Sequence, residues 1–447
     1  MTDVIDGLPG QRDDAAARPI PPGAHSPQPS PPASARSRRG LDWLVFFIAD
    51  VQTGFGPFIA VFLTTQKWTQ ADIGLVLTIG SLVSLGGQIP LGAFVDRLKA
   101  LRPAIAVSLL LIGGAALAFA LWPVFAVVAA SRVVHAAASC VAGLALVSMS
   151  VRLAAPGQVG ARLGRNAAFA SAGTGIAAAA MGAVGYYLSS HAVFYLTALM
   201  VVPALLALSR IRPDEIAMPP AIRQNAEEGR GEAKVGLAAG LLALARNRPL
   251  VIFAGCVMAF HLANAAMLPL AASMLTMRST EAATVMVAAA MVVPQFTVTV
   301  LSPLAGRLAQ SLGRRPVLLA GFGALAVRGL LFATVTDPVG LVAIQILDGL
   351  SAAVFGVLVP LVVFDLTHRS GHFNLAQGAV GCAMGIGASI STLLAGIVAD
   401  RFGSFAAFEM LAALAALGFL AVLVAMPETR RREEDAAISA ASPDGGQ

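Results

Sequence analysis

Few side chains that could carry a charge or bind a polar group lie inside the long apolar stretches of this sequence. Among them are Asp50, Arg132, His135, His261, Asn264, Arg328 and Asp348. A charged group in an apolar medium costs free energy, so each needs a function or a partner. Low dielectric raises the pKa of a carboxyl group and a nearby cation lowers it, so such a group can bind and release a proton. We therefore interpret Asp50 as a proton- or cation-binding carboxylate coupled to Arg132, with a static ion pair between two helices as the alternative.

The other five residues are interpreted from their spacing or their depth in the apolar runs. His135 follows Arg132 by three residues and shares its helix face, and an imidazole titrates near neutral pH, so it is a candidate proton relay. His261 and Asn264 are also three apart and are interpreted as a hydrogen-bonding pair that lines a cavity. Arg328 and Asp348 lie at similar depth in neighbouring apolar runs, which favours a structural ion pair.

The elements that position these residues follow from composition. Of the 447 residues, 57% are hydrophobic and only 12% are charged, whereas soluble domains carry about 25% charged residues. About 20 apolar residues in a helix cross the hydrocarbon of a bilayer. Runs of this kind predict an all-α membrane protein with twelve transmembrane helices, at 41–65, 72–95, 103–121, 124–151, 162–187, 192–211, 249–274, 281–305, 316–335, 339–365, 373–399 and 405–426.

The polar segments divide the chain and orient it. We expect a disordered tail over 1–40, a six-helix bundle over 41–211, a linker over 212–248, a second bundle over 249–426 and a tail over 427–447. Most Lys and Arg residues fall on the side of the tails and the linker, and only Lys67, Arg278 and Arg401 fall on the other side. Positively charged loops stay in the cytoplasm, so both termini are predicted to be cytoplasmic. The formal charge of +6 therefore does not indicate nucleic-acid binding.

Two short charged turns interrupt the apolar runs at matching places. The first follows the second span and contains Gly92, Asp96, Arg97 and Arg102, and the second follows the eighth span and contains Gly306, Gly313, Arg314 and Arg315. Gly306 lies 214 residues after Gly92, close to half the length of the chain. A repeat of this length predicts two parallel halves around a midplane site.

Both turns resemble the loop signature of the major facilitator superfamily, Gly-x-x-x-Asp-Arg-x-Gly-Arg-Arg/Lys, and the layout extends the resemblance over 41–426. Lys99 stands at the family's second glycine, and Gln310 and Ser311 replace Asp-Arg in the second turn. The resemblance implies that Asp96 and Arg97 bridge helix ends between the halves and hold the outward-facing state, so the halves are gated unequally. It also implies that helices one, four, seven and ten line a central cavity, where six residues would converge: Asp50, Arg132, His135, His261, Asn264 and Asp348.

Function is expected to follow this layout. Arg132 with Ala136 four residues later is similar to the helix-four signature of drug/proton antiporters. We expect alternating access with proton-coupled efflux of a small amphipathic organic compound. The alternatives are proton-coupled uptake of a small polar nutrient or organic anion, and a non-transporting membrane sensor or assembly partner. No ATP-binding loop or metal-ligand spacing occurs, so we expect no enzyme activity, metal or cofactor. The expected setting is a bacterial inner membrane, with the protein working as a monomer.

Overall fold

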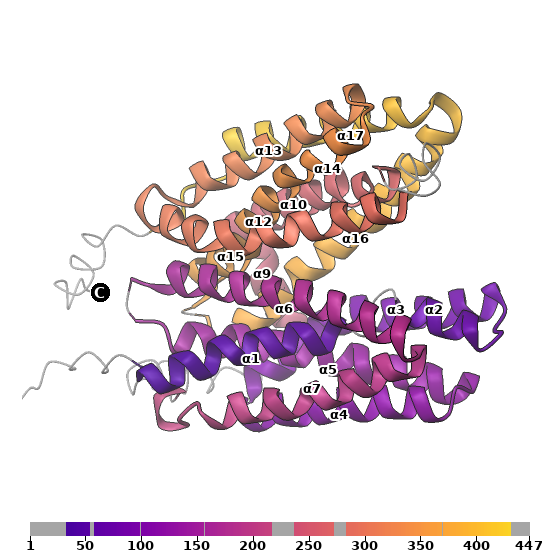
Figure 1. Ribbon diagram of the computed structural model, residues 1–447. Helices are drawn as coiled ribbons and strands as arrows, with labels where there is room; N and C mark the ends of the chain where they lie inside the picture. The colour runs from indigo at the N-terminus through magenta and orange to yellow at the C-terminus, as the bar shows by residue number, and fades with distance from the viewer. Residues whose placement is uncertain are drawn as a thin grey trace, which may run out of the picture. The chain divides into compact units, whose positions relative to one another are not determined.

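The computed structural model describes residues 33–53, 58–98, 100–155, 157–216, 237–271, 283–368 and 370–430, and all regular structure within them is helical (Figure 1). A lipid environment offers the backbone no hydrogen bonds, and a helix satisfies them within its own segment. The helices are α1 (Ala35–Thr53), α2 (Phe58–Thr65), α3 (Gln70–Arg97), α4 (Leu101–Leu121), α5 (Phe125–Arg152), α6 (Val159–Tyr187), α7 (Ser190–Ser209), η1 (Asp214–Ile216), α9 (Leu237–Arg246), α10 (Arg248–Asn264), α12 (Ala283–Ser311), α13 (Arg314–Thr334), α14 (Pro338–Ala343), α15 (Gln345–Thr367), α16 (Phe373–Phe402) and α17 (Ser404–Ala425).

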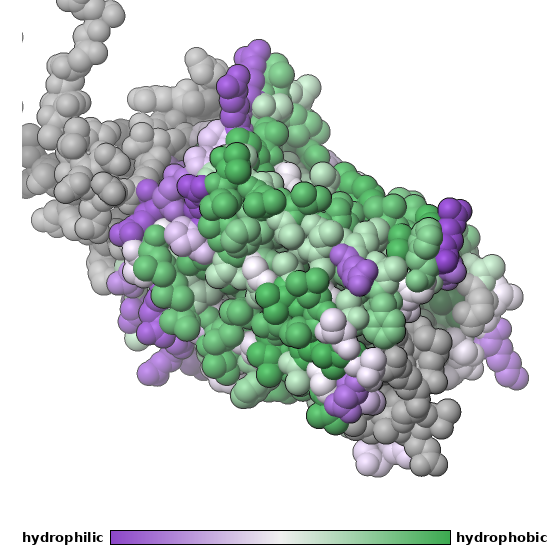
Figure 2. Space-filling model, turned by 90° about the horizontal axis from the view of Figure 1, so that it is seen from above, coloured by the Kyte–Doolittle hydropathy of each residue, from purple (hydrophilic) through white to green (hydrophobic). Residues whose placement is uncertain are grey.

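The predicted membrane class is confirmed. Within the described residues, 12 segments are long and apolar enough to cross a membrane. The first, Ala35–Ala60, joins α1 to the start of α2, and the tenth, Pro338–Thr367, joins α14 to α15. Figure 2 shows a face dominated by hydrophobic residues, with the hydrophilic ones gathered mainly at its left and right margins. Exposed side chains such as Leu82, Ile176 and Leu393 are suited to contact lipid tails.

Two predicted boundaries need correction. Residues 35–40, expected to belong to the disordered tail, are the first turns of α1. Ser34 caps this helix by accepting a hydrogen bond from the backbone N–H of Ser37, and its own hydroxyl and N–H donate to Glu215 of η1. The linker over 212–248 was expected to be one long hydrophilic connection, but it contains the apolar helix α9, whose Gly240 packs against Leu375. Residues 1–32, 217–236 and 431–447 of the expected tails and linker lie outside the described residues, as do Lys99 and Arg278 of the charge count.

Each half packs around its own core. Most buried apolar residues from Leu41 to Ile216 form one cluster, and most of those from Leu244 to Met426, joined by Leu163, form another. In Figure 1 the indigo-to-magenta helices α1–α7 therefore group apart from the orange-to-yellow helices α12–α17. The halves meet chiefly where α3 packs against α16 and α6 packs against α12.

Glycines allow these two helix pairs to approach backbone to backbone. A Cβ atom at Gly160 of α6 would lie 2.9 Å from the carbonyl oxygen of Gly306 on α12, and one at Gly306 would meet the carbonyl of Gly160. On the other pair, a Cβ atom at Gly378 of α16 would meet the carbonyl of Gln88 on α3. Small residues are typical of membrane helices in such close contact. The halves are therefore fitted to each other along both pairs.

Candidate functional site

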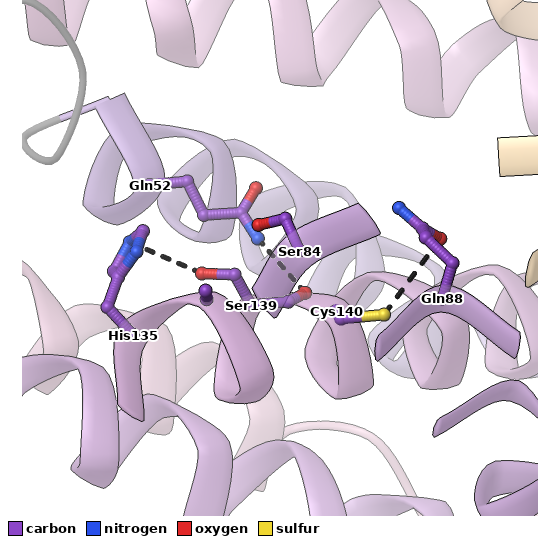
Figure 3. A pocket seen from close by; sticks show the side chains of 7 residues that line it. Gln52, Ser84, Gln88, His135, Ser139 and Cys140 are labelled. Carbon is purple, nitrogen blue, oxygen red and sulfur yellow. Dashed lines mark hydrogen bonds between the residues drawn. The ribbon is translucent and has the colours of Figure 1, made fainter. Parts of the chain in front are cut away.

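A cavity of about 320 Å³ opens within the N-terminal half, between α1, α3 and α5 (Figure 3). It is lined by Gln52, Ser84, Gln88, His135, Ala136, Ser139 and Cys140. The amide of Gln52 donates to the carbonyl oxygen of Ser139 over 3.4 Å, and the Ser139 hydroxyl lies 3.3 Å from Nε2 of His135. The Cys140 thiol lies 3.9 Å from Oε1 of Gln88, toward which it donates. The cavity thus offers neutral hydrogen-bonding groups from three helices.

Asp50 does not line this cavity. It lies on α1 two residues before Gln52, about 200° around the helix at 3.6 residues per turn. One turn earlier, the carbonyl of Phe46 contacts Gly173, so this side of α1 packs against α6. The Asp50 side chain is buried, and within the described part of the chain no ion pair joins it to Arg132. The coupling of Asp50 to Arg132 stays a prediction.

Arg132 and His135 lie together on α5, as their spacing predicts. Both are 9% exposed. The guanidinium of Arg132 packs against α3 at Gly80, where a Cβ atom would lie 2.7 Å from Nε. Of the six residues expected to converge, His135 alone is among the residues that line the cavity.

Three others of the six lie in the C-terminal half. His261 of α10 turns its Nδ1 to the carbonyl of Val257 in its own helix, at 2.9 Å. Asn264 and Asp348 both contact Arg328, which is 1% exposed: Nη1 donates to Asn264 Oδ1 over 2.5 Å and to Asp348 Oδ1 over 2.8 Å. Asn264 is therefore a hydrogen-bond partner of the Arg328–Asp348 ion pair and does not pair with His261 as the spacing suggested.

The buried cluster around Arg328 ties three helices together. Besides Asn264 of α10 and Asp348 of α15, the guanidinium donates from Nη2 to Oε1 of Gln345 over 2.8 Å and lies 5.3 Å from the ring centroid of Phe332. A buried cation needs such partners, because desolvation without them is costly. The expected single polar site is thus divided between the two halves: His135 lines the cavity in the N-terminal half, and Asn264 and Asp348 bind Arg328 in the C-terminal half.

The carboxylate of Asp96, at the end of α3, binds the first turn of α16 in the other half. Its Oδ1 accepts from the backbone N–H of Asn374 at 2.9 Å and from the Asn374 amide at 2.8 Å, and its Oδ2 accepts from the N–H of Leu375 at 2.9 Å. Helix N-termini have unpaired N–H groups and favour negative charge. Ser148 of α5 donates to Oδ1 of Asn374 over 2.8 Å, and a Cβ atom at Gly92 would meet the Asn374 carbonyl. This contact joins three helices across the interface.

The neighbouring residues of the first turn do not share this contact. Arg97 is exposed. Arg102 is partly buried, and its Nε has no hydrogen-bond partner among the described residues.

The second turn also reaches across the interface, by different chemistry. The amide of Gln310 donates to the carbonyl of Gly157 in the loop before α6. Arg314 pairs with Asp365 of α15 at 2.8 Å, and Gly313 has a φ of 108°, which favours glycine. Both carboxylate oxygens of Glu428 accept backbone N–H groups, those of Arg314 and Arg315. Each turn thus contacts the opposite half, one through a carboxylate and the other through a neutral amide.

Sequence reasoning missed a buried charge cluster near the start of α1. Asp42, 3% exposed, accepts from Arg162 over 2.5 Å and from Arg165 over 2.7 Å. Arg162 also binds Asn166 one turn on, which binds Ser150 of α5 over 2.7 Å. The i, i+3 and i+4 spacing of the three α6 residues was a usable signal for one face of a helix. Their partner on α1 follows only from the packing.

Comparisons with known proteins agree with this architecture. The sequence model of the Major Facilitator Superfamily matches residues 42–294 and 257–443. Uncharacterized MFS-type transporters from two strains of Mycobacterium tuberculosis are 39% identical over 395 residues, which is 88% of this chain and 94% of theirs. A variant of the Escherichia coli fucose:proton symporter FucP superimposes with a TM-score of 0.67 at 18% identity, over 86% of this chain and 97% of that one. A second FucP structure, in the outward conformation, gives 0.66. At such identity the structural likeness establishes the fold.

Proposed function

The chain belongs to the major facilitator superfamily, and we propose that it is a proton-coupled secondary transporter that works by alternating access. The observation that carries the proposal is the closure between the halves where the two turns lie. There Asp96 binds the start of α16, and Gly160 lies against Gly306. We call the end of the molecule that carries these two turns, residues 92–102 and 306–315, the basic end. Contacts of this kind can form in one state and break in another, and so set the balance between the two states.

The positive-inside rule places the basic end in the cytoplasm. The closed state would therefore be the one that faces outward, with the cavity beyond the closure. Both termini and the linker would then be cytoplasmic, and the protein would lie in the inner membrane of a bacterium. In this arrangement Asp96 is the cytoplasmic gate, supported on the other helix pair by Gln310.

Asp50 is the proposed proton-binding group. It is a buried carboxylate in a membrane-spanning helix, without an ion pair among the described residues. Such a group is stable as the neutral acid and can lose its proton when its surroundings become wet or cationic. Because Asp50 and the cavity lie on different sides of α1, proton and solute would be coupled through movement of that helix. Arg132 and His135 of α5 are the proposed partners in this step.

Reconstitution into vesicles with an internal pH-sensitive dye tests the proposal. A solute gradient should drive proton movement, and an imposed pH gradient should concentrate the solute. The Asp50→Asn variant should still exchange solute for solute but should lose the response to pH. Asp72→Asn serves as the control. Asp72 lies in the first turn of α3, at the opposite end of that helix from Asp96. Proton-driven transport that survives Asp50→Asn would rule out this group as the carrier.

The same assay determines the direction of transport and the class of solute. Export of an amphipathic compound and uptake of a polar nutrient or anion predict opposite responses to an inward pH gradient. If the purified chain moves neither solute nor protons while its tails or linker bind a partner, it is a sensor or assembly protein instead.

A further inference from the structure

We infer that the cavity between α1, α3 and α5 recognises a small neutral solute rich in hydroxyl or amide groups. It would not select an amphipathic cation or an organic anion. This inference rests on the proposed transport function and specifies its solute. It also favours the polar-solute alternative over the amphipathic compound that the sequence suggested.

Unused hydrogen-bonding capacity is the first observation. Within the described residues, Oε1 of Gln52, the hydroxyl of Ser84 and the amide nitrogen of Gln88 line the cavity without a hydrogen bond to the protein. Together they offer one acceptor, one group that donates and accepts, and one double donor. Hydroxyl or amide groups on a solute can form hydrogen bonds with all three of these lining groups. An apolar solute would leave them unpaired, at a cost that selects against it.

The charge of the lining is the second observation. No Asp, Glu, Lys or Arg is among the seven residues that line the cavity. A charged solute would lose its hydration there without gaining a counter-ion, and such desolvation is expensive. Asp50 lies on another side of α1, and Arg132 packs toward Gly80. The lining therefore favours neutral molecules.

The size of the cavity limits the solute further. Its volume of about 320 Å³ is near the lower end of the roughly 300–1,000 Å³ that is usual for ligand pockets. Of the seven lining residues, only Ala136 has a side chain without a hydrogen-bonding group. A compact polar molecule fits these limits better than a multi-ring amphipathic compound.

Gln88 connects this cavity to the contact between the halves. Its side chain lines the cavity, and a Cβ atom at Gly381 of α16 would lie 2.7 Å from its Oε1. Ser84, Gln88, Gly92 and Asp96 follow one another along α3 at four-residue intervals, so each lies about one turn from the next. A solute that binds the Gln88 amide would thus act about two turns along the same helix from the gate at Asp96.

The test compares solute classes and matched variants. Purified protein in vesicles is assayed for solute counterflow with xylitol and glucose as neutral polyols, tetraphenylphosphonium as an amphipathic cation and benzoate as an anion. We expect counterflow with a neutral polyol alone. Gln88→Leu and Ser84→Ala should each weaken its apparent affinity by roughly 3- to 10-fold, the usual effect of one lost neutral hydrogen bond. Ser81→Ala should have no effect, because the exposed Ser81 hydroxyl is bound to Leu77 in its own helix.

The outcomes separate this inference from the proposed function. Proton-coupled movement of tetraphenylphosphonium or benzoate, without the polyols, would overturn the solute class and leave the transport function standing. Polyol counterflow unchanged in both cavity variants would overturn the assigned site. Absence of any solute or proton movement would overturn both proposals.

Discussion

Replacing Asp96 by Asn should open the basic end. In the structure the carboxylate accepts three hydrogen bonds from the first turn of α16. An Asn side chain can keep those from Asn374, but its NH₂ group would face the N–H of Leu375, so one charge-assisted bond is lost. That bond is worth about 1.5–3 kcal/mol. The negative charge at the helix N-terminus adds about 0.3–1 kcal/mol. The sum, about 2–4 kcal/mol, shifts the balance between closed and open states by roughly 30- to 700-fold.

Thiol labelling measures this shift directly. Ser302 of α12 is fully buried against Gly164 of α6 at the closed interface, and Ser302→Cys is a nearly isosteric change. In a variant whose three native cysteines are replaced by alanine, the rate of maleimide labelling at position 302 reports the open population. Asp96→Asn should raise that rate by the factor above and should slow transport.

Two comparators make this result interpretable. Gln310→Ala removes one neutral, exposed hydrogen bond across the interface, so its effect should not exceed about tenfold. Asp337→Asn removes a carboxylate that caps α14 within its own half, and it should leave labelling unchanged. Labelling of Asp96→Asn at the wild-type rate, or equal effects of Asp96→Asn and Gln310→Ala, would refute the reasoning.

Two further predictions concern the packing between and within the halves. Gly306→Ala places a methyl group against the carbonyl of Gly160, so the basic end should fail to close: labelling at the interface becomes fast and transport is lost. Gly323→Ala, where a Cβ atom meets only one side-chain atom at 3.9 Å, should behave as wild type, and equal effects of the two variants would contradict this view. Arg328→Met leaves the partly buried Asp348 without its cation and should cost at most about 3–5 kcal/mol of stability, measured by denaturation in detergent. The double variant with Asp348→Leu should recover most of that loss, and a single variant as stable as wild type would show that the pair is not structural.

Much of the fold follows from the residues one by one. Backbone groups in a bilayer must be paired within their own segment, so apolar runs of spanning length specify helices, and their number and approximate bounds were predictable. The repeated turns at Gly92 and Gly306 predicted two similar halves. Helix ends were less predictable: α1 starts early because Ser34 and Glu215, far apart in sequence, bind each other.

Part of the site was also within reach of sequence. Arg132 and His135 share a face of α5 because of helical spacing, and equal depth in neighbouring spans predicted that Arg328 and Asp348 would pair. The cavity was not predictable, because Gln52, Ser84 and Ser139 are neutral residues that look ordinary in an apolar helix. Their significance comes from converging on one space from three helices.

The sequence by itself thus determined the membrane class, the repeat and the two charged turns at matching places in the halves. Only the tertiary structure decided which groups meet: Asp96 with the N-terminus of α16, Asp42 with Arg162, and Gln88 with both the cavity and Gly381. The physical reason is range. Hydrophobic patterning acts on a whole segment and can be read along the chain. A hydrogen bond requires about 3 Å between two atoms, and the rotation and contact of packed helices decide which atoms come that close.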